Sequence, residues 1–343
     1  MRRRRLRRTV GLLLAIVVVA LAAGVYWVQG QLDPRGPAGA AVRVEIPSGS
    51  STGAIADQLD RAGVITNATV FRLYLKARGA GGFEAGSYDL HLKSSMGMVL
   101  DTLSAGPSLP PSTRLTIPEG LTLAQTSERV AKVDHLAAAP FLAAASDGSV
   151  RSAFEPAGSN NLEGLVFPET YRIDQDEDEK AVLQQMVSTF DSVGTELGLG
   201  NSQQLVGYTP YQVVIVASLI EAEAKSDADR PKIARVIYNR LAAHMPLGID
   251  SAFYYALPAD RRGTSLRESD LTKDGPYNTR TRAGLVPTPI MAPGRASLAA
   301  ALNPAPGSWL YYVLQDSTTH AFSTTYTQFL KDKAAAEKAG LIP

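Results

Sequence analysis

The longest apolar stretch in the chain lies close to its N-terminus. Residues 10–28 are all apolar, glycine or aromatic, and at helical rise they span about 28 Å, close to the thickness of a bilayer's hydrocarbon core. Tyr26 and Trp27 stand at the far end of the stretch, where amphipathic rings suit the lipid–water interface. The pattern predicts a transmembrane helix over 10–28. A cleaved signal peptide, with a small-residue cleavage site at 20–22, is the alternative, and the length of the stretch favours the retained helix.

The residues on either side of this stretch set its expected orientation. Six of the first eight residues are arginine. By the positive-inside rule, the basic stub over 1–9 stays in the cytoplasm and the chain after the helix is exported. Residues 29–41 are rich in Gly, Pro and Ala, and we interpret them as a tether. The prediction is a single-pass protein of the cell membrane with its body on the extracytoplasmic side.

Alternating and helical patterns predict a small α+β unit over 42–106. The expected elements, in chain order, are a strand at 42–46, helices at 52–59 and 69–78, a strand at 86–92 and a helix at 96–103. A proline-rich linker over 107–113 separates this unit from a larger domain over 114–343. Just after the linker the opening pattern returns, with Ile-Pro-Glu-Gly at 117–120 where the small unit has Ile-Pro-Ser-Gly at 46–49. We interpret the two stretches as one supersecondary unit used twice.

The most distinctive predicted helix lies in the middle of the larger domain. A Thr-Pro-Tyr-Gln capping box at 209–212 predicts its start. Residues 213–220 are apolar except for Ser218, so this helix should be buried almost all round. It ends with Glu221 and Glu223. A carboxylate at the end of an apolar helix must reach water, find a partner or keep its proton.

Composition and charge exclude several classes of function. Of the 34 basic residues, six lie in the stub, which leaves 28 against 33 acidic residues in the rest of the chain. A mildly acidic body argues against nucleic-acid binding. The chain has no cysteine, which excludes disulfides, thiolate metal sites and a cysteine nucleophile. It also has no H-E-x-x-H motif and no glycine-rich phosphate loop, so we expect no metal and no cofactor.

Two local motifs have simple structural interpretations. Gly-Ser-Ser-Thr-Gly at 49–53 matches the G-x-S-x-G pattern of serine hydrolases, but we interpret it as a Ser/Thr-rich helix cap. The acidic run at 174–179 is typical of the first turn of a helix. A calcium loop is the alternative, and it is disfavoured because Glu179 stands where such a loop needs glycine and Gln185 where it needs glutamate.

Six blocks of the chain, taken in order, resemble the signatures of one family. They are LEGLVFPETY at 162–171, VASLIEAEA at 216–224, VIYNRL at 236–241, PYNT at 276–279, the proline-rich segment at 284–298, and the segment from Leu310 to Ser323. These blocks resemble the YceG-like (MltG) endolytic murein transglycosylases, and the likeness runs from about residue 42 to the C-terminus. The chain departs from the family pattern after Asp250, where Ser251 replaces the common Pro, and after Thr279, where Arg280 replaces the usual Tyr. In the proline-rich segment, Val286 also replaces the first Pro.

The resemblance implies an α+β fold with a single N-terminal transmembrane helix, a LysM-like subdomain over 42–106 and a mixed α/β catalytic domain over 114–343. It implies Glu221 as the catalytic acid/base of a lytic transglycosylase. In that reaction the C6 hydroxyl of N-acetylmuramic acid attacks its own C1 and leaves a 1,6-anhydro end. One carboxylic acid suffices for this chemistry, whereas a glycoside hydrolase generally needs two. The implied partners are peptidoglycan glycan strands and, as a further possibility, peptidoglycan synthases.

Other polar residues of these blocks are candidates for binding the sugar chain. They are Ser218, which shares a helix face with Glu221, and Glu163, Glu223, Asp250, Tyr277 and Asn278. For the Pro-Tyr-Asn segment at 276–278, a well-capped turn is the alternative. For Glu163, a salt bridge of a loop is the alternative.

Two other functions stay open from the sequence. A glycan-binding scaffold that positions synthases without cutting would tolerate Gln in place of Glu221. A true muramidase would use a second carboxylate such as Asp250, and its product would carry a reducing end.

Overall fold

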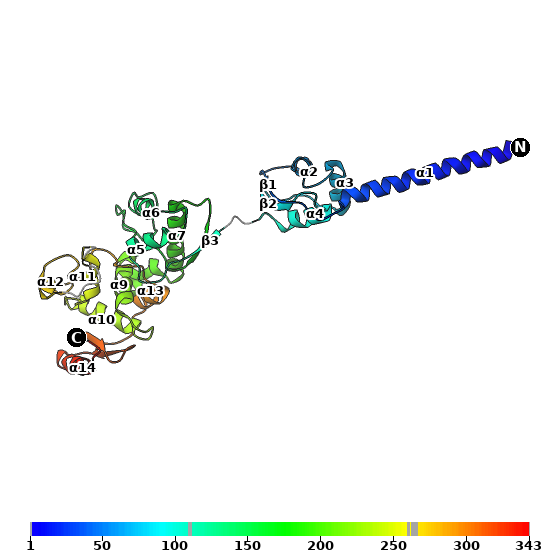
Figure 1. The fold of residues 1–343 in the computed structure, drawn as a ribbon. Helices are drawn as coiled ribbons and strands as arrows, with labels where there is room; N and C mark the ends of the chain where they lie inside the picture. The colour runs from blue at the N-terminus through cyan, green and yellow to red at the C-terminus, as the bar shows by residue number, and fades with distance from the viewer. Residues whose placement is uncertain (1, 109–111, 259–260, 262–266, 343) are drawn as a thin grey trace. The chain divides into compact units, whose positions relative to one another are not determined.

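The chain folds into two units, Met1–Pro111 and Ser112–Pro343. The structure is a computed structural model and describes residues 2–108, 112–258, 261 and 267–342. Helices and short two-stranded antiparallel sheets make it a mixed α/β protein (Figure 1). The linker predicted at 107–113 falls in part on residues 109–111, which lie outside the described residues.

The first unit begins with the helix α1, Arg2–Leu32. Its segment Gly11–Leu32 is long and apolar enough to cross a membrane. This segment contains most of the predicted span and continues four residues beyond its predicted end. Side chains such as Leu13 and Val19 are exposed, as suits a helix that lies in lipid.

A strand–helix–helix–strand arrangement follows, in the order predicted from the sequence. Its elements are β1 (Ala41–Ile46), α2 (Thr52–Arg61), α3 (Ala68–Arg78) and β2 (Gly86–His91), followed by α4 (Met96–Ala105). β1 and β2 pair antiparallel, with Val44 opposite Tyr88, and both side chains are buried in the core of this unit. The hydroxyl of Ser51 accepts the N–H of Ala54 at 3.2 Å, which confirms the helix cap predicted for the Gly-Ser-Ser-Thr-Gly motif.

The second unit opens with the same arrangement, which confirms the predicted repeat. Its elements are β3 (Ser112–Thr116), α5 (Leu123–Val130), α6 (Ala138–Ala144) and β4 (Thr170–Asp174), and β3 pairs antiparallel with β4. The turn after the first strand is also the same in both copies. Gly49 and Gly120 take left-handed φ values of 77° and 78°, a region that favours glycine, and each precedes a capping Ser or Thr by two residues.

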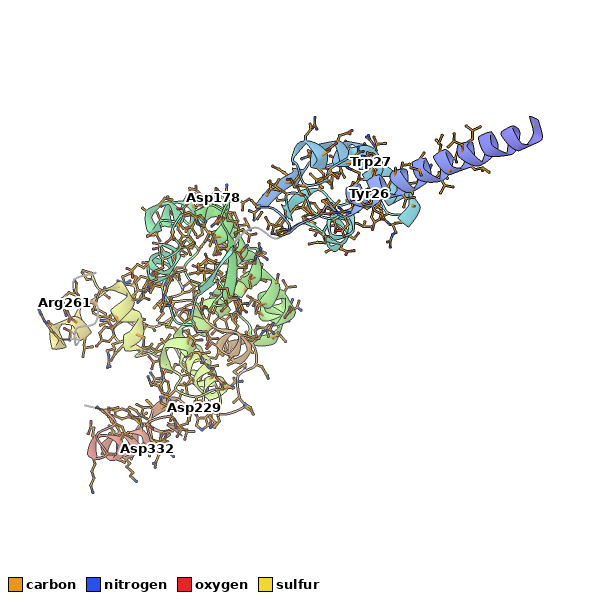
Figure 2. The ribbon with its side chains drawn as sticks, turned by 45° about the vertical axis from the view of Figure 1, so that its right-hand side comes forward. Tyr26, Trp27, Asp178, Asp229, Arg261 and Asp332 are labelled. Carbon is orange, nitrogen blue, oxygen red and sulfur yellow. The ribbon has the colours of Figure 1, made fainter. Side chains whose placement is uncertain are left out.

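A helix follows the acidic run at 174–179, but only Glu179 lies within it, so the prediction that the whole run forms the first turn is wrong. Asp178 caps α7 (Glu179–Glu196), and its carboxylate accepts the N–H of Ala181 at 2.8 Å (Figure 2). Asp174 closes β4 instead of belonging to a loop. Val182 and Phe190 on α7 are fully buried and join the core of the second unit.

The centre of the second unit is α9, Pro210–Glu223. The predicted capping box forms, and residues 213–220 are each 3% exposed or less. Helices α10 (Arg230–Ala242), α11 (Asp250–Ala256) and α13 (Arg295–Leu302) pack against it. The remaining elements are η1 (Leu199–Asn201), α8 (Ser202–Val206), α12 (Glu268–Thr272), β5 (Tyr311–Leu314), β6 (His320–Ser323) and α14 (Tyr326–Lys338). Because α9 is surrounded by protein, the polar residues at its end are held by a rigid frame.

Candidate active site

Glu221 lies in the last turn of α9, and its side chain is only 7% exposed. Its Oε2 accepts the backbone N–H of Gly294 at 2.9 Å and lies 3.2 Å from Nη1 of Arg230. Gly294 is the N-cap of α13, so the partial positive charge of that helix end also faces the carboxylate. The buried glutamate has therefore found partners, one of the three outcomes expected for a carboxylate at the end of an apolar helix.

Arg230 is the first residue of α10, and its side chain is 12% exposed. It also donates to the hydroxyl of Ser297 and lies 3.0 Å from Asp227. Burial alone would lower the pKa of Arg230, but the charges of Glu221 and Asp227 outweigh burial and raise it. Arg230 therefore presents a permanent positive charge to Glu221.

A second carboxylate, that of Glu119, lies beside the same backbone residue. The space that a Cβ atom would fill at Gly294 is occupied by the carboxylate of Glu119, so only glycine fits there without displacing it. The loop that carries Glu119 is fixed by two backbone hydrogen bonds. The N–H of Gly120 donates to the carbonyl of Ala292 at 2.9 Å, and the N–H of Ala292 donates to the carbonyl of Leu121 at 2.8 Å.

The environment of Glu119 favours its protonated form. Burial is the main cause that raises its pKa, and the negative charge of Glu221 is the second. Asp227 also raises the pKa of Glu119, while Arg230 lowers it. The net direction is upward, which makes Glu119 a carboxyl group that holds a proton to higher pH than an ordinary glutamate.

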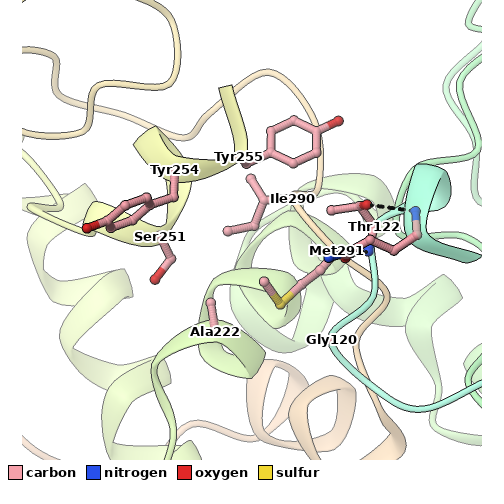
Figure 3. Close-up of a pocket in the computed structure, with 9 residues that line it drawn as sticks. Gly120, Thr122, Ala222, Ser251, Tyr254, Tyr255, Ile290 and Met291 are labelled. Atoms are coloured by element: carbon pink, nitrogen blue, oxygen red, sulfur yellow. Dashed lines mark hydrogen bonds between the residues drawn. The ribbon is translucent and has the colours of Figure 1, made fainter. Parts of the chain in front are cut away.

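A pocket of about 350 Å³ opens next to these two glutamates. Its lining residues, which define the site pocket, are Gly120, Thr122, Gln125, Ala222, Ser251, Tyr254, Tyr255, Ile290 and Met291. Figure 3 shows the residues of α11 on one side and Gly120 and Thr122 on the other. Neither glutamate lines the pocket, but each is directly followed along the chain by a residue that does. The rings of Tyr254 and Tyr255 give the pocket aromatic faces of the kind that stack on flat apolar surfaces of a ligand.

Besides Ser218, which bonds the backbone of Ile290, three of the predicted binding residues contact residues that line the site pocket. Glu163 accepts the hydroxyl of Tyr255 at 3.1 Å, and the ring of Tyr277 lies 5.3 Å from that of Tyr255. Glu223 accepts the hydroxyl of Ser251 at 2.6 Å. These side chains lie one layer behind the pocket surface and hold its lining in place.

Glu223 has a second donor in Tyr312, whose hydroxyl lies 3.1 Å from Oε2. Burial is the main cause, and the charge of Glu223 the second, that raises the pKa of Tyr312 well above its usual value near 10. Tyr312 therefore stays a neutral phenol that donates to the carboxylate.

Ser218 and Asp250 take part in other interactions. Ser218 is fully buried, where its hydroxyl donates to the carbonyl of Ile215 at 2.8 Å and accepts the N–H of Ile290 at 3.1 Å. It thereby joins α9 to the segment that carries Ile290 into the site pocket. Asp250 accepts two bonds from Arg280, at 2.6 and 2.7 Å, in an exposed ion pair.

Asn278 is 2% exposed and makes the bonds of a turn residue. Its amide donates to the carbonyls of Leu271 and Lys273 at 3.0 and 2.8 Å, and its oxygen accepts the N–H of Arg280 at 3.0 Å. It also lines a second, smaller pocket of about 230 Å³, together with Thr279. This geometry matches the capped turn that the sequence left open as an alternative.

Two of the residues that depart from the family pattern, Ser251 and Arg280, make side-chain bonds in this region. Ser251 donates to Glu223, and Arg280 donates two hydrogen bonds to Asp250. Proline has no hydroxyl or N–H to donate, and tyrosine cannot form a bidentate pair. Both bonds therefore depend on the residues that this chain carries.

The sequence did not reveal the roles of Glu119, Arg230 and Gly294. A signal for Glu119 was present, because the two repeat copies differ at one position, where Ser48 corresponds to Glu119. A carboxylate that appears only in the larger domain suggests a use specific to that domain. For Arg230 the signal was the unpaired charge expected at Glu221. In the described part of the chain no group of three or more His, Asp or Glu residues is placed to hold a metal ion.

Comparison with known proteins finds one family over most of the chain. Residues 44–335 match the model of the YceG-like family. A protein of Bacillus subtilis (strain 168) named endolytic murein transglycosylase is 31% identical over 310 residues, which cover 85% of this chain and 84% of that protein. A protein of the same name from Streptococcus pneumoniae serotype 2 (strain D39) is 30% identical over 331 residues, and these cover 88% of this chain but 60% of that protein. The crystal structure of a yceG-like protein from Listeria monocytogenes aligns with a TM-score of 0.55 and 30% identity, over 85% of this chain and 99% of that chain.

Proposed function

The chain belongs to the YceG-like family of murein transglycosylases, and from that premise we propose that it cuts nascent peptidoglycan strands internally. The bond cut would be the β-1,4 bond between N-acetylmuramic acid and N-acetylglucosamine, and the product would carry a 1,6-anhydro-N-acetylmuramic acid end. The match over residues 44–335 and the names of the relatives support a lytic transglycosylase of peptidoglycan. The choice of bond and the anhydro product are the proposal.

The environment of Glu221 carries this proposal. As a carboxylic acid, Glu221 donates its proton to the glycosidic oxygen while the bond from that oxygen to C1 breaks. The C6 hydroxyl oxygen then bonds to C1, and its proton returns to the carboxylate. During the step Glu221 becomes negative, and the N–H of Gly294 and the guanidinium of Arg230 are already in place to stabilise that charge.

The reaction needs no water and no second substrate. The attacking oxygen belongs to the same sugar as the carbon it attacks, which gives the rate advantage of an intramolecular reaction. A largely buried acid suits this chemistry, because exclusion of water prevents hydrolysis from competing with ring closure.

The site pocket is the proposed place of the glycan strand. Tyr254 and Tyr255 offer stacking faces for sugar rings, and Ser251 and Thr122 offer hydroxyls. Of the predicted binding residues, Glu163, Glu223 and Tyr277 support this surface from behind, while Ser218, Asp250 and Asn278 shape the segments around it.

The proposed location is the outer face of the cell membrane, with α1 as a single anchor. This orientation follows from the arginines before α1 and would hold the second unit close to newly made glycan strands. The βααβ arrangement over 41–91 is compatible with the LysM-like subdomain that the family implies, and we propose it as a glycan contact. Association with peptidoglycan synthases would place the enzyme where strands emerge.

The test is mass spectrometry of glycan fragments released by the full-length chain in detergent micelles, with un-crosslinked nascent strands as substrate. Wild type is compared with Glu221→Gln, which keeps the shape of the side chain but removes the acid. The matched control is Glu337→Gln, the same change at an exposed position of α14. We expect anhydro ends from wild type and from the control, and none from Glu221→Gln.

Other products would contradict this proposal. Reducing ends would indicate a muramidase. Binding of strands without cleavage by any variant would indicate a scaffold for synthases. Equal cleavage by wild type and Glu221→Gln would show that Glu221 is not the catalytic acid.

A further inference from the structure

Two carboxylates that are about a hundred residues apart in the second unit, those of Glu119 and Glu221, meet at one backbone residue. Gly294 donates its N–H to Glu221 at 2.9 Å, and the carboxylate of Glu119 rests against the Cα of the same glycine. The separation between the two carboxylates is therefore at most roughly 7 Å. Hydrolases of glycosides place their two carboxylates at comparable separations, so the arrangement is one from which both groups can act on one bond.

The two glutamates differ in what surrounds them. Glu221 is 7% exposed and receives two donors that favour a negative charge, Arg230 and the N–H of Gly294. Glu119 lies in the loop after β3, and within the described part of the chain its carboxylate accepts no hydrogen bond. Two adjacent carboxylates repel each other when both are ionised, so such a pair retains one proton more readily than two separate groups.

We propose that Glu119 is a positioning residue of the active site, which shares one proton with Glu221 and so keeps Glu221 supplied with the proton it donates. The inference rests on the proposed function. Before cleavage the pair holds one proton. Glu221 passes it to the glycosidic oxygen as the C1–O bond breaks, the C6 oxygen bonds to C1, and the proton of that hydroxyl returns to the pair. The pair ends the step with one proton, as it began.

The charges around Glu119 agree with this role. The groups that act on it are Glu221 from α9, and Arg230 and Asp227 from the start of α10 and the loop before it. Burial and the charge of Glu221 raise the pKa of Glu119, as expected where two neighbouring carboxyl groups retain one proton between them.

A purely structural role for Glu119 is separable from this one. The loop is fixed by the backbone bonds between Gly120, Leu121 and Ala292, none of which uses the carboxylate of Glu119. Replacement of Glu119 by Gln should therefore leave the fold intact. Gly294→Ala provides a second route, because the new methyl group would displace the carboxylate of Glu119 while the N–H to Glu221 remains. The φ of Gly294 is −77°, which alanine adopts without strain.

The experiment measures kcat and KM across pH 4 to 9 for the full-length chain in detergent, with un-crosslinked glycan strands as substrate. The variants are Glu119→Gln, Gly294→Ala and, as the matched control, Glu196→Gln. The control makes the same change at a side chain that is 63% exposed and pairs with Arg295. We expect Glu119→Gln to lower kcat at neutral pH about 100-fold with KM changed less than about 3-fold, in the range of a lost acid–base group. Gly294→Ala should lower kcat in the same direction, and Glu196→Gln should stay within about 3-fold of wild type.

The pH profile separates proton sharing from a loss of shape. A pair that retains one proton between its two groups stays active to higher pH than a lone carboxyl group does, because activity is lost only when both groups are ionised. In Glu119→Gln the alkaline limb of the profile should therefore move to lower pH.

The possible outcomes distinguish a failure of this inference from a failure of the proposed function. Wild-type kcat and an unchanged pH profile in Glu119→Gln would overturn the inference, as would an equal loss in Glu196→Gln. If Glu119→Gln does not fold, Gly294→Ala decides by the same criteria. Absence of cleavage by wild type would instead overturn the proposed function. If Glu221→Gln is inactive while Glu119→Gln is fully active, only this inference is overturned.

Discussion

The ion pair between Glu221 and Arg230 gives a quantitative prediction. Arg230→Met keeps the length of the side chain but removes its charge, which leaves the carboxylate of Glu221, 7% exposed, with the N–H of Gly294 as its described donor. Removal of one partner of a buried pair costs about 3–5 kcal/mol. The residual exposure of Arg230, 12%, and the remaining bond from Gly294 shift the expected loss to about 2–4 kcal/mol. For a unit of this size, that corresponds to a fall in Tm of roughly 5–15 °C.

The assay is thermal and urea unfolding of the full-length chain in detergent, in a Trp27→Phe background. The chain has two tryptophans, so the emission then reports on Trp309 in the second unit. A double-mutant cycle with Glu221→Gln isolates the pair: the double variant should recover at least about 1 kcal/mol of the loss, because a neutral Gln needs no cation. Arg295→Met is the matched control, since Arg295 pairs with Glu196 where both side chains are more than half exposed. It should cost less than about 1 kcal/mol.

Two results would refute this reasoning. One is a loss in Arg230→Met no larger than that in Arg295→Met, which would mean that the carboxylate is solvated in spite of its low exposure. The other is strict additivity in the cycle, which would mean that Arg230 stabilises the unit through packing and not through Glu221.

Three further predictions concern the surroundings of the site. Ser218→Ala should lower the free energy of unfolding in urea by about 1–3 kcal/mol, because it leaves the buried N–H of Ile290 without its acceptor. A loss below about 0.5 kcal/mol would contradict a stabilising role of this hydrogen bond. Tyr312 has a raised pKa in the folded chain, so its contribution to stability is present below pH 10 and falls as pH rises above it, when the unfolded chain ionises first. Tyr312→Phe should therefore flatten the decline in unfolding free energy between about pH 9.5 and 11, and an unchanged slope would argue against the shift. Asp250→Asn breaks an exposed pair with Arg280 and should change stability by less than about 1 kcal/mol, and its products should keep anhydro ends, whereas reducing ends or complete inactivity would restore Asp250 as a catalytic candidate.

Periodicity and capping signals were sufficient for most of the elements. The strand–helix–helix–strand order of the first unit, its repeat at β3, a helix at the acidic run and the burial of α9 were all predicted from local patterns, although α7 starts later than expected. These features depend on residues within a few positions of one another, which is the range over which helical and strand periods act.

The partners of Glu221 could not be predicted in the same way. Arg230 is nine residues away, Gly294 is 73 residues away and Glu119 is about a hundred residues away in the opposite direction. No local pattern links such positions, because tertiary packing alone brings them together. The sequence left three outcomes open for Glu221, which were access to water, a partner or a retained proton, and it did not single out Arg230 among the basic residues. The LysM-like interpretation of the first unit, the boundaries of the domains and the contacts of the predicted binding residues with glycan stay predictions.

The backbone bonds between Gly120 and Ala292 have a consequence for incomplete molecules. The site forms only when the loop after β3 bonds to the segment before α13. These two segments are about 170 residues apart in the chain, so the ribosome makes them at different times. A chain that stops after Glu221 but before Gly294 carries the glutamate without the glycine whose N–H binds it. Such a truncated copy would lack the oriented carboxylate, so the site is complete only once the start of α13 has been made.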